Sequence, residues 1–167
     1  RPGTGTRVNS GGAKIIFSDS NTHHRGAENY RRSGVTDPMR IEKDGFYAHQ
    51  VMWNGWVDTD KFQTYIIGHW NYPKNTVKPI YVVSNGKNVE LFLNGQSLGK
   101  GKREYNFLFT FDKVSYQPGK LEAVSYDKDG KEVSRYMIST VGEPAKLKLT
   151  TIQNPEGFHA DGADMAL

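Results

Sequence analysis

Hydrophobic and polar residues alternate with a period of two through the middle of the chain, which is the pattern of half-buried β-strands. Two Asn-Gly dipeptides, Asn85-Gly86 and Asn94-Gly95, flank the clearest example, residues 87–93. The apolar positions of this segment all fall on one face: Val89, Leu91 and Leu93. Asn-Gly favours a type I′ hairpin turn, because both central residues of that turn need positive φ. We therefore predict an antiparallel β-meander with a hairpin at each dipeptide.

Similar short apolar segments continue on both sides of the meander. Strand-like segments are expected at Tyr65–Trp70, Ile80–Ser84, Tyr105–Phe111, Lys120–Tyr126 and Glu132–Thr140. Pro118-Gly119 and Asp129-Gly130 supply further reversals, and about seven strands with turns roughly every ten residues are typical of a small β-sandwich. No cysteine pair marks an antibody-type domain, so this pattern predicts only the sandwich architecture.

The first third of the chain has a different pattern. A short apolar run at Ala13–Asp19 predicts a buried strand, and the polar residues 20–37 that follow show no periodicity. Apolar residues then recur at helical spacing over Glu42–Trp53, and Asn54-Gly55 ends this helix. A single strand, loop and helix cannot bury their own faces, so this βα unit implies packing partners elsewhere.

Composition excludes several classes of protein. Hydrophobic residues make up 36% and aromatic residues 12% of the 167 residues, which is enough for a modest core. No apolar run approaches the roughly 20 residues of a membrane span. The net charge is +4, but basic and acidic residues are interspersed, which argues against a nucleic-acid-binding surface. The absence of cysteine excludes disulfides, thiolate metal sites and a cysteine nucleophile.

We divide the sequence into three parts: 1–57 with the βα unit, 58–143 with the sandwich, and 144–167 as the start of a further β domain. The chain begins Arg1-Pro2-Gly3 and ends on an apolar stretch, and we expect it to be a segment of a longer protein. A strand is expected at Leu147–Ile152, after the joint Gly142–Ala145.

Two stretches resemble glycoside hydrolase family 2, the β-galactosidase family. Residues 12–37 with Lys43–Trp53 are similar to the end of the catalytic barrel, and Gly34-Val-Thr-Asp37 matches a loop that precedes the last helix. His69-Trp70-Asn71 with Pro79–Gly99 resembles the immunoglobulin-like domain that follows the barrel. The resemblance thus implies a mainly β fold, with an immunoglobulin-like antiparallel sandwich preceded by a remnant βα unit of a (β/α)8 barrel.

The resemblance also implies a retaining β-glycosidase that uses two glutamates about 5 Å apart, the first within an Asn-Glu pair. This sequence contains no Asn-Glu dipeptide, and Ala13–Asp19 corresponds to the last barrel strand. Both catalytic glutamates are therefore expected outside this chain, which should be inactive alone. No cofactor or metal is expected. The expected partners are a carbohydrate substrate, the rest of the barrel, and a second copy of the exposed fragment.

Candidate substrate contacts follow from the position of the loop after the last barrel strand, because loops at the carboxyl ends of barrel strands build the active site. Asn21, His23 and Arg25 are the candidates for contacts with sugar hydroxyls or a charged substituent, and Phe17 is the candidate for stacking on a sugar ring. The alternative is a solvated surface loop with Phe17 in a core.

Other clusters have alternative interpretations. His23, His24, Arg25 and Glu28 resemble a metal cluster only superficially, since adjacent histidines rarely converge on one ion. Arg31-Arg32 would suit an anionic substrate or ion pairs with Glu28 and Asp37. Trp70 and Tyr72 could form a carbohydrate platform or a packed domain joint. Aspartates in turns could hold Ca²⁺, although turn chemistry alone explains them: Asp127, Asp129 and Asp161.

Two rival functions remain open at this point. One is a stand-alone immunoglobulin-like module that binds carbohydrate or protein at a surface. The other is a small autonomous enzyme that uses Asp19 and Glu28. The resemblance fits a periplasmic or extracellular bacterial protein, but no residue decides the compartment, the sugar or the linkage.

Overall fold

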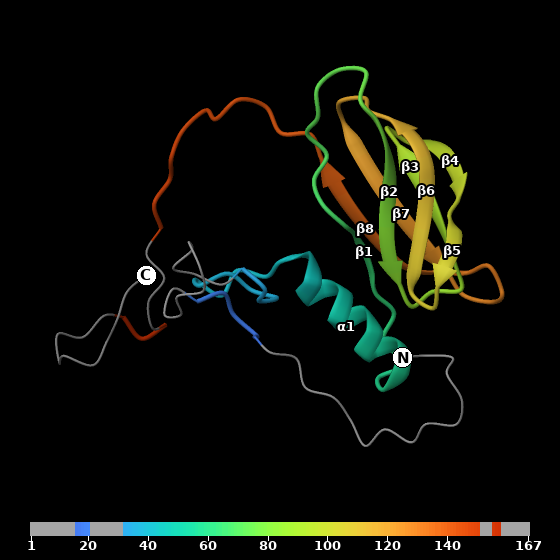
Figure 1. Cartoon of the computed structure of the whole chain (residues 1–167), viewed down its shortest axis with the longest axis horizontal. Coiled ribbons are helices and arrows are strands. Elements are labelled where there is room, and N and C mark those ends of the chain that lie inside the picture. Colours follow the sequence, from blue (N-terminus) through green and yellow to red (C-terminus); the bar gives the residue numbers. More distant parts are fainter. Residues whose placement is uncertain (1–15, 21–31, 151–154, 158–167) are drawn as a thin grey trace, which may run out of the picture.

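The computed structural model describes residues 16–20, 32–150 and 155–157 (Figure 1). One helix, α1, spans Asp44–Trp56. It is followed by eight strands: β1 Thr64–Ile66, β2 Val77–Ser84, β3 Asn88–Leu93, β4 Gln96–Lys100, β5 Lys102–Tyr105, β6 Leu108–Ser115, β7 Lys120–Tyr126 and β8 Glu132–Ser139. Among the residues described, no helix is long and apolar enough to cross a membrane.

The strands form two antiparallel sheets packed face to face (Figure 1). One sheet has the order β1-β2-β6-β5 and the other has the order β4-β3-β7-β8. If the strands are lettered A, B, C, C′, D, E, F and G along the chain, these orders become A-B-E-D and C′-C-F-G. This is the arrangement of immunoglobulin-like sandwiches, so the predicted mainly β fold with an antiparallel sandwich is confirmed.

The main core lies between the sheets and follows the predicted alternation. On β3 the three aliphatic residues of the inner face are buried, whereas Glu90 and Phe92 between them are half-buried. Trp70, only 1% exposed, closes one end of this core, and its indole Nε1 donates a hydrogen bond to the Gln117 carbonyl at 3.0 Å. The inner residues of both sheets complete the cluster: Ile66, Ile80, Val82, Val89, Leu91, Leu93, Phe109, Phe111, Val114, Leu121 and Ala123.

The two Asn-Gly dipeptides behave differently. Asn94 and Gly95 have φ of 51° and 83°, and they connect the paired strands β3 and β4 as predicted. The hairpin prediction for Asn85-Gly86 is wrong, because β2 and β3 lie in different sheets and the dipeptide crosses between them. The Asn85 side chain instead fixes the preceding connector: its Oδ1 accepts from the Gln63 amide at 2.7 Å, and its Nδ2 donates to the Lys61 carbonyl at 2.7 Å.

The predicted strand Tyr105–Phe111 is divided by a turn. Asn106 and Phe107 form a tight reversal between β5 and β6, so the alternation of phenylalanines holds only from Phe109 onward. Phe107 leaves the core and meets the end of α1, where its ring lies 5.1 Å from that of Trp56 in an edge-to-face contact. Periodicity alone did not reveal this turn, because Phe107 keeps the spacing of a strand residue.

Helix α1 packs on the outer face of the β1-β2-β6-β5 sheet (Figure 1). Val51 is 0% exposed and forms a second apolar cluster with Tyr65 of β1 and Val83 of β2, whose side chains point away from the main core. The rings of Tyr47 and Tyr65 stack with centroids 4.3 Å apart, and the Tyr65 hydroxyl donates to Asp44 at 2.8 Å. The helix is therefore a third layer over one part of the sandwich.

The segments before the helix contain no regular strand among the described residues. Within Ala13–Asp19 only residues 16–19 are described, and they show an isolated parallel bridge from Ser18 to Thr36. Thr36 makes a second, antiparallel bridge with Glu42. Assignment of this part to a barrel remains a prediction.

The chain beyond the sandwich is extended. Residues 141–150 contain no strand, and Leu147 and Leu149 are both 98% exposed. The expected strand from residue 147 is therefore not formed up to residue 150. Residues 151–154 lie outside the described part, and the division of the sequence into three domains remains a prediction.

Candidate functional site

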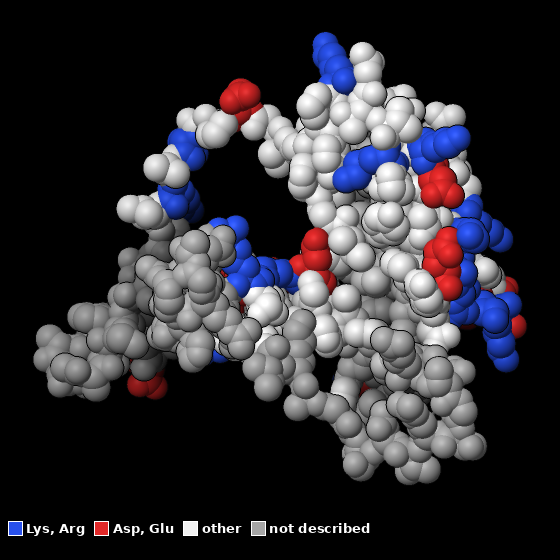
Figure 2. Space-filling model, viewed as in Figure 1, with Lys and Arg blue, Asp and Glu red and all other residues white. Residues whose placement is uncertain are grey.

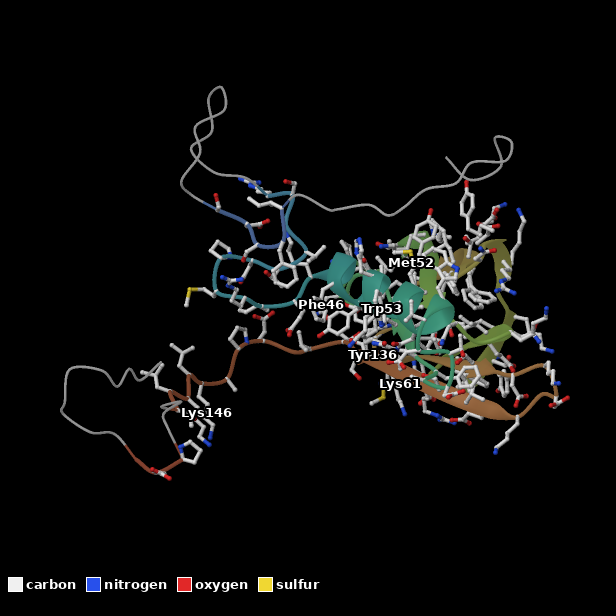
Figure 3. All side chains as sticks on the ribbon, turned by 90° about the horizontal axis from the view of Figure 1, so that it is seen from below. Phe46, Met52, Trp53, Lys61, Tyr136 and Lys146 are labelled. Carbon is white, nitrogen blue, oxygen red and sulfur yellow. The ribbon has the colours of Figure 1, made fainter. Side chains whose placement is uncertain are left out.

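The candidate site is an apolar groove of about 300 Å³ between residue 17 and the outward side of α1. Its lining residues are Phe17, Val35, Phe46, His49, Gln50 and Trp53. Phe17 is 54% exposed, so it is not the core residue that its apolar surroundings in the sequence favoured. Phe46 and Trp53 project from α1 (Figure 3), and the Trp53 side chain is 60% exposed. The groove thus presents aromatic surfaces to solvent.

Backbone hydrogen bonds hold Phe17 against the segment that precedes the helix. The Phe17 carbonyl accepts from the amides of Val35 and Thr36 at 2.8 and 3.1 Å, and the Asp19 amide donates to the Thr36 carbonyl at 2.9 Å. Gly34 permits this close approach, because a Cβ there would lie 2.4 Å from the Asp19 nitrogen. The segment Gly34-Val-Thr-Asp37 therefore holds Phe17 and Asp19 in place through backbone hydrogen bonds.

An ion pair fixes the same segment to the start of α1. Lys43 Nζ contacts Asp19 Oδ1 and Oδ2 at 3.0 and 2.9 Å and also donates to the Arg32 carbonyl at 3.2 Å. The Gly34 amide donates to Asp19 Oδ1 at 2.8 Å. These donors, Lys43 first, lower the pKa of the Asp19 carboxyl below its ordinary value. Asp19 therefore remains ionised and acts as a structural acceptor.

Of the predicted substrate contacts, only Phe17 lies in the described part of the chain. Asn21, His23 and Arg25 lie outside the described residues, as do His24, Glu28 and Arg31. Their roles stay predictions. Among the residues that the structure describes, no three histidine, aspartate or glutamate side chains are grouped so that they could hold a metal ion.

A chain of amide side chains, which sequence reasoning missed, fixes the helix to the sandwich. Gln63 Nε2 donates to Gln50 Oε1 at 2.6 Å, and Asn54 Nδ2 donates to Gln63 Oε1 at 3.1 Å. Because Gln63 also binds Asn85 through its backbone amide, the contacts run from α1 to the crossover between the sheets. No local pattern predicts them, since the partners are 9 to 22 residues apart.

The aromatic residues near Trp70 pack against one another. Trp70 is buried, and its ring meets the ring of Tyr116 edge-to-face at 5.2 Å. Tyr72 stacks on His69 at 4.5 Å, while the Lys78 ammonium lies 4.1 Å from the Tyr72 ring centroid. The rings therefore form a packed joint.

The aspartate turn after β7 is likewise explained without an ion. Asp127 Oδ1 accepts hydrogen bonds from the backbone amides of Asp129 and Lys131, both at 2.9 Å. This arrangement is an Asx-type turn in which the carboxylate binds its own backbone. Asp161 lies outside the described residues.

Part of the sandwich matches a known sequence family. Residues 75–134 match the family described as a domain of unknown function, DUF4982. The match begins just before β2 and ends within β8, and it therefore covers most of the sandwich but not α1.

Curated relatives extend the similarity across nearly the whole chain. A β-glucuronidase of Formosa agariphila is 41% identical over 162 residues, which are 95% of this chain and 16% of the relative. The β-galactosidase BoGH2A of Bacteroides ovatus is 30% identical over 133 residues, which are 79% of this chain and 15% of the relative. The chain thus spans about one sixth of the length of these relatives.

Solved structures are also similar to most of this chain. A β-glucuronidase from glycoside hydrolase family 2 superposes with a TM-score of 0.77 and 39% identity, over 90% of this chain and 15% of the other. A family 2 member from Bacteroides cellulosilyticus gives a TM-score of 0.68 and 27% identity, over 81% of this chain and 20% of the other. The similarity therefore includes regions outside the sandwich.

Proposed function

Because this chain belongs to glycoside hydrolase family 2 and corresponds to a small part of its larger enzymes, we propose that the whole protein is a retaining β-glycosidase. It hydrolyses O-glycosidic bonds in carbohydrate. The observation that carries this proposal is the 41% identity to a β-glucuronidase over 95% of the chain. A similarity limited to the sandwich would have supported only a shared accessory domain.

Retaining hydrolysis needs a nucleophilic carboxylate and a second carboxyl group that donates a proton to the leaving oxygen. The proton donor works best with a raised pKa, which is the opposite of the shift at Asp19. The ion pair with Lys43 also occupies both Asp19 oxygens. Asp19 is therefore unsuited to the role of proton donor. Because the chain also contains no Asn-Glu dipeptide, we assign both catalytic carboxylates to the rest of the protein, and the 167-residue chain alone should be inactive.

The part of this chain nearest to the substrate is the segment around Phe17. An exposed aromatic ring on a rigid backbone suits stacking against the apolar face of a sugar. We propose that Phe17 provides this surface and that the loop residues Asn21, His23 and Arg25 contact hydroxyl groups or a charged substituent. The sandwich then has a supporting role, because it holds α1 in place.

A variant of the full-length enzyme tests the role of Phe17. Phe17→Ala should lower kcat/KM by about tenfold, since one aromatic contact with the substrate is lost. Phe62→Ala is the matched control, because Phe62 is a partly exposed phenylalanine on the connector to β1 and does not line the groove. Equal kcat/KM for Phe17→Ala and wild type would remove Phe17 from the substrate site.

The sugar is either galactose or glucuronic acid. The resemblance in the sequence favours the β-galactosidase type, whereas the 41% identical relative and the 39% identical structure are β-glucuronidases. Initial rates of the full-length protein on an aryl β-galactoside and an aryl β-glucuronide decide between them. NMR of the first-formed sugar should show the β-anomer, and cleavage of neither substrate would contradict the proposed activity.

The remaining barrel is the expected partner of the outward side of α1. Trp53 is exposed there. A second groove of about 740 Å³ runs between the helix and the β5–β6 hairpin, and Trp56, which is also exposed, lines it. Exposed apolar surfaces of this kind mark interaction sites. We propose that the rest of the enzyme covers them in the whole protein, and that the isolated chain covers them by self-association.

A further inference from the structure

A groove of about 440 Å³ opens at one edge of the sandwich. It runs between β4, the edge of one sheet, and β5 and β6 of the other. Between β4 and β5, Gly101 lets the chain pass closely over Phe111, because a Cβ there would lie 2.7 Å from the phenylalanine ring. The groove is therefore formed by the chain crossing from one sheet to the other.

A β-bulge supplies one side of the groove. Ile80 pairs with Phe111 and Lys78 pairs with Val114, so Asp112 and Lys113 together oppose the single residue Pro79. Lys113 has a φ of 54°, a conformation that is uncommon for a residue with a side chain. The bulge puts two successive exposed residues on the same stretch of β6 and brings a lysine to the groove.

The charged side chains of the groove are mainly basic. Lys100, Lys102 and Lys113 line it, and Asp112 is the only acidic residue among its lining residues. Lys102 is neutralised by Glu104 at 2.9 Å. Lys113 forms no ion pair in the described part of the chain, and neither does Lys100, although Lys100 lies opposite Glu90 in the β3–β4 register. Figure 2 shows lysine and arginine residues, with a few acidic ones among them, along the side where β4 and β5 lie.

The other lining residues add the contacts that a sugar needs. Leu98, which is 42% exposed, offers apolar surface beside the buried Phe111, and Ser115 and Gln117 offer hydrogen-bonding groups. Apolar surface beneath a sugar ring, polar groups for its hydroxyls and ammonium groups for a carboxylate are the elements of a site for an acidic sugar. Neutral sugars would leave the lysines without partners.

We propose that this groove is an ancillary binding site for carboxylated oligosaccharides, that is, sugar chains that contain uronate residues. Lys100 and Lys113 bind the carboxylates, and the apolar surface of Leu98 supports a ring. The site is separate from the groove at Phe17 and requires no catalysis. It would give the sandwich a binding role in addition to its supporting one, and it stands whether or not the proposed glycosidase activity is found.

NMR titration of the 15N-labelled chain with tetragalacturonate tests this inference. The amide shifts of β4, of the Asp112-Lys113 bulge and of Ser115 should move together and saturate. A neutral galactose tetrasaccharide should leave them unchanged. A salt concentration of about 1 M should weaken tetragalacturonate binding strongly, because the Debye length then falls to about 3 Å and the charges are screened from each other. Inorganic phosphate is titrated as a further comparison ligand, because it carries negative charge but has no sugar ring.

Lysine variants give the decisive comparison. Lys100→Gln and Lys113→Gln should each weaken tetragalacturonate binding by about tenfold, as expected for the loss of one charge-assisted hydrogen bond. Lys146→Gln is the charge-matched control, because Lys146 lies in the extended segment away from the sandwich (Figure 3). Unchanged melting temperatures of the variants establish that the sandwich remains folded.

Several outcomes would overturn the proposal. Unchanged affinity in both groove variants would do so, as would equal binding of the neutral tetrasaccharide or shifts confined to other parts of the chain. Phosphate binding as tight as that of tetragalacturonate would reduce the groove to a simple anion site. Failure of the full-length protein to hydrolyse glycosides would instead contradict the proposed function and leave this result intact.

Discussion

At the residue scale, Asp19 and Lys43 fix the segment that carries Phe17. The pair joins residues 24 positions apart, and its carboxylate also accepts from the Gly34 amide. The position of the exposed aromatic ring thus depends on charged groups that do not themselves contact substrate in our account. The ionisation of Asp19 is therefore a direct measure of this arrangement.

The pKa of Asp19 in the folded chain should lie below its ordinary value of 3.8, because the Lys43 hydrogen bond favours the carboxylate. The folded pKa is lower than the unfolded one, so the stabilising contribution is complete above the unfolded value. It is lost as the pH falls through the folded pKa. A 13C-carboxyl NMR titration measures the midpoint, and a midpoint at or above 3.8 would contradict the ion pair.

Gly86 should tolerate no side chain. A Cβ at this position would lie 2.8 Å from the Ser125 Cβ in the buried crossover, so Gly86→Ala should destabilise the chain by roughly 1–3 kcal/mol. Chemical denaturation measures the change. Gly142→Ala is the control, because nothing lies within 4 Å of its added Cβ. If Gly86→Ala lowers the free energy of unfolding no more than Gly142→Ala does, the crossover accommodates the added methyl group.

The two Asn-Gly dipeptides show what the sequence could and could not predict at this scale. Local turn chemistry was sufficient for Asn94-Gly95, where strands on both sides pair with each other. At Asn85-Gly86 tertiary contacts prevail: the asparagine side chain binds residues 61 and 63, and the glycine fits against Ser125. Both dipeptides look alike locally, so only the sheet arrangement distinguishes them.

At the scale of elements, the main finding is that α1 packs on the sandwich. The periodic apolar residues predicted a helix with a buried face, and the structure places that face on β1 and β2. The sequence could not predict which surface the helix packs on. Tyr65 and Val83 lie on the outer face of their sheet, and an outer face is ordinarily expected to meet solvent. The pattern therefore gave the helix but not its partner.

Val51 should be the most sensitive aliphatic position of this interface. It is fully buried in the cluster with Tyr65 and Val83, so Val51→Ala should cost roughly 1–3 kcal/mol of unfolding free energy. Val57→Ala carries the same change at an exposed position just after the helix and should have little effect. If urea unfolding shows equal stabilities for the two variants, the helix is not docked as described.

At the scale of the whole molecule, the chain is a folded sandwich with apolar side chains of α1 exposed to solvent, among them Trp53 and Trp56. The predicted sandwich and the resemblance to family 2 agree with the structure and the relatives. The part of the candidate site that could be predicted is smaller: Phe17 is an exposed aromatic residue at a groove, whereas Asn21, His23 and Arg25 of the loop that follows lie outside the described part. Sequence signals locate a loop, but they do not fix side-chain positions within it.

The exposed tryptophans predict concentration-dependent association of the isolated chain. Trp53 and Trp56 would be covered in a self-associated form, because the rest of the enzyme is absent. Sedimentation velocity over a range of concentrations should show larger species that decrease in the double variant Trp53→Gln, Trp56→Gln. A monomer at all concentrations in the unmodified chain would contradict this prediction.

The most direct test of the account locates the nucleophile of the full-length enzyme. A fluorinated glycoside of the preferred sugar should form a stable glycosyl-enzyme, as expected for a retaining mechanism. Mass spectrometry of the labelled peptides then identifies the modified carboxylate. We predict that the label lies outside the 167 residues of this chain. A label on any aspartate or glutamate within them, Asp19 included, would contradict the account.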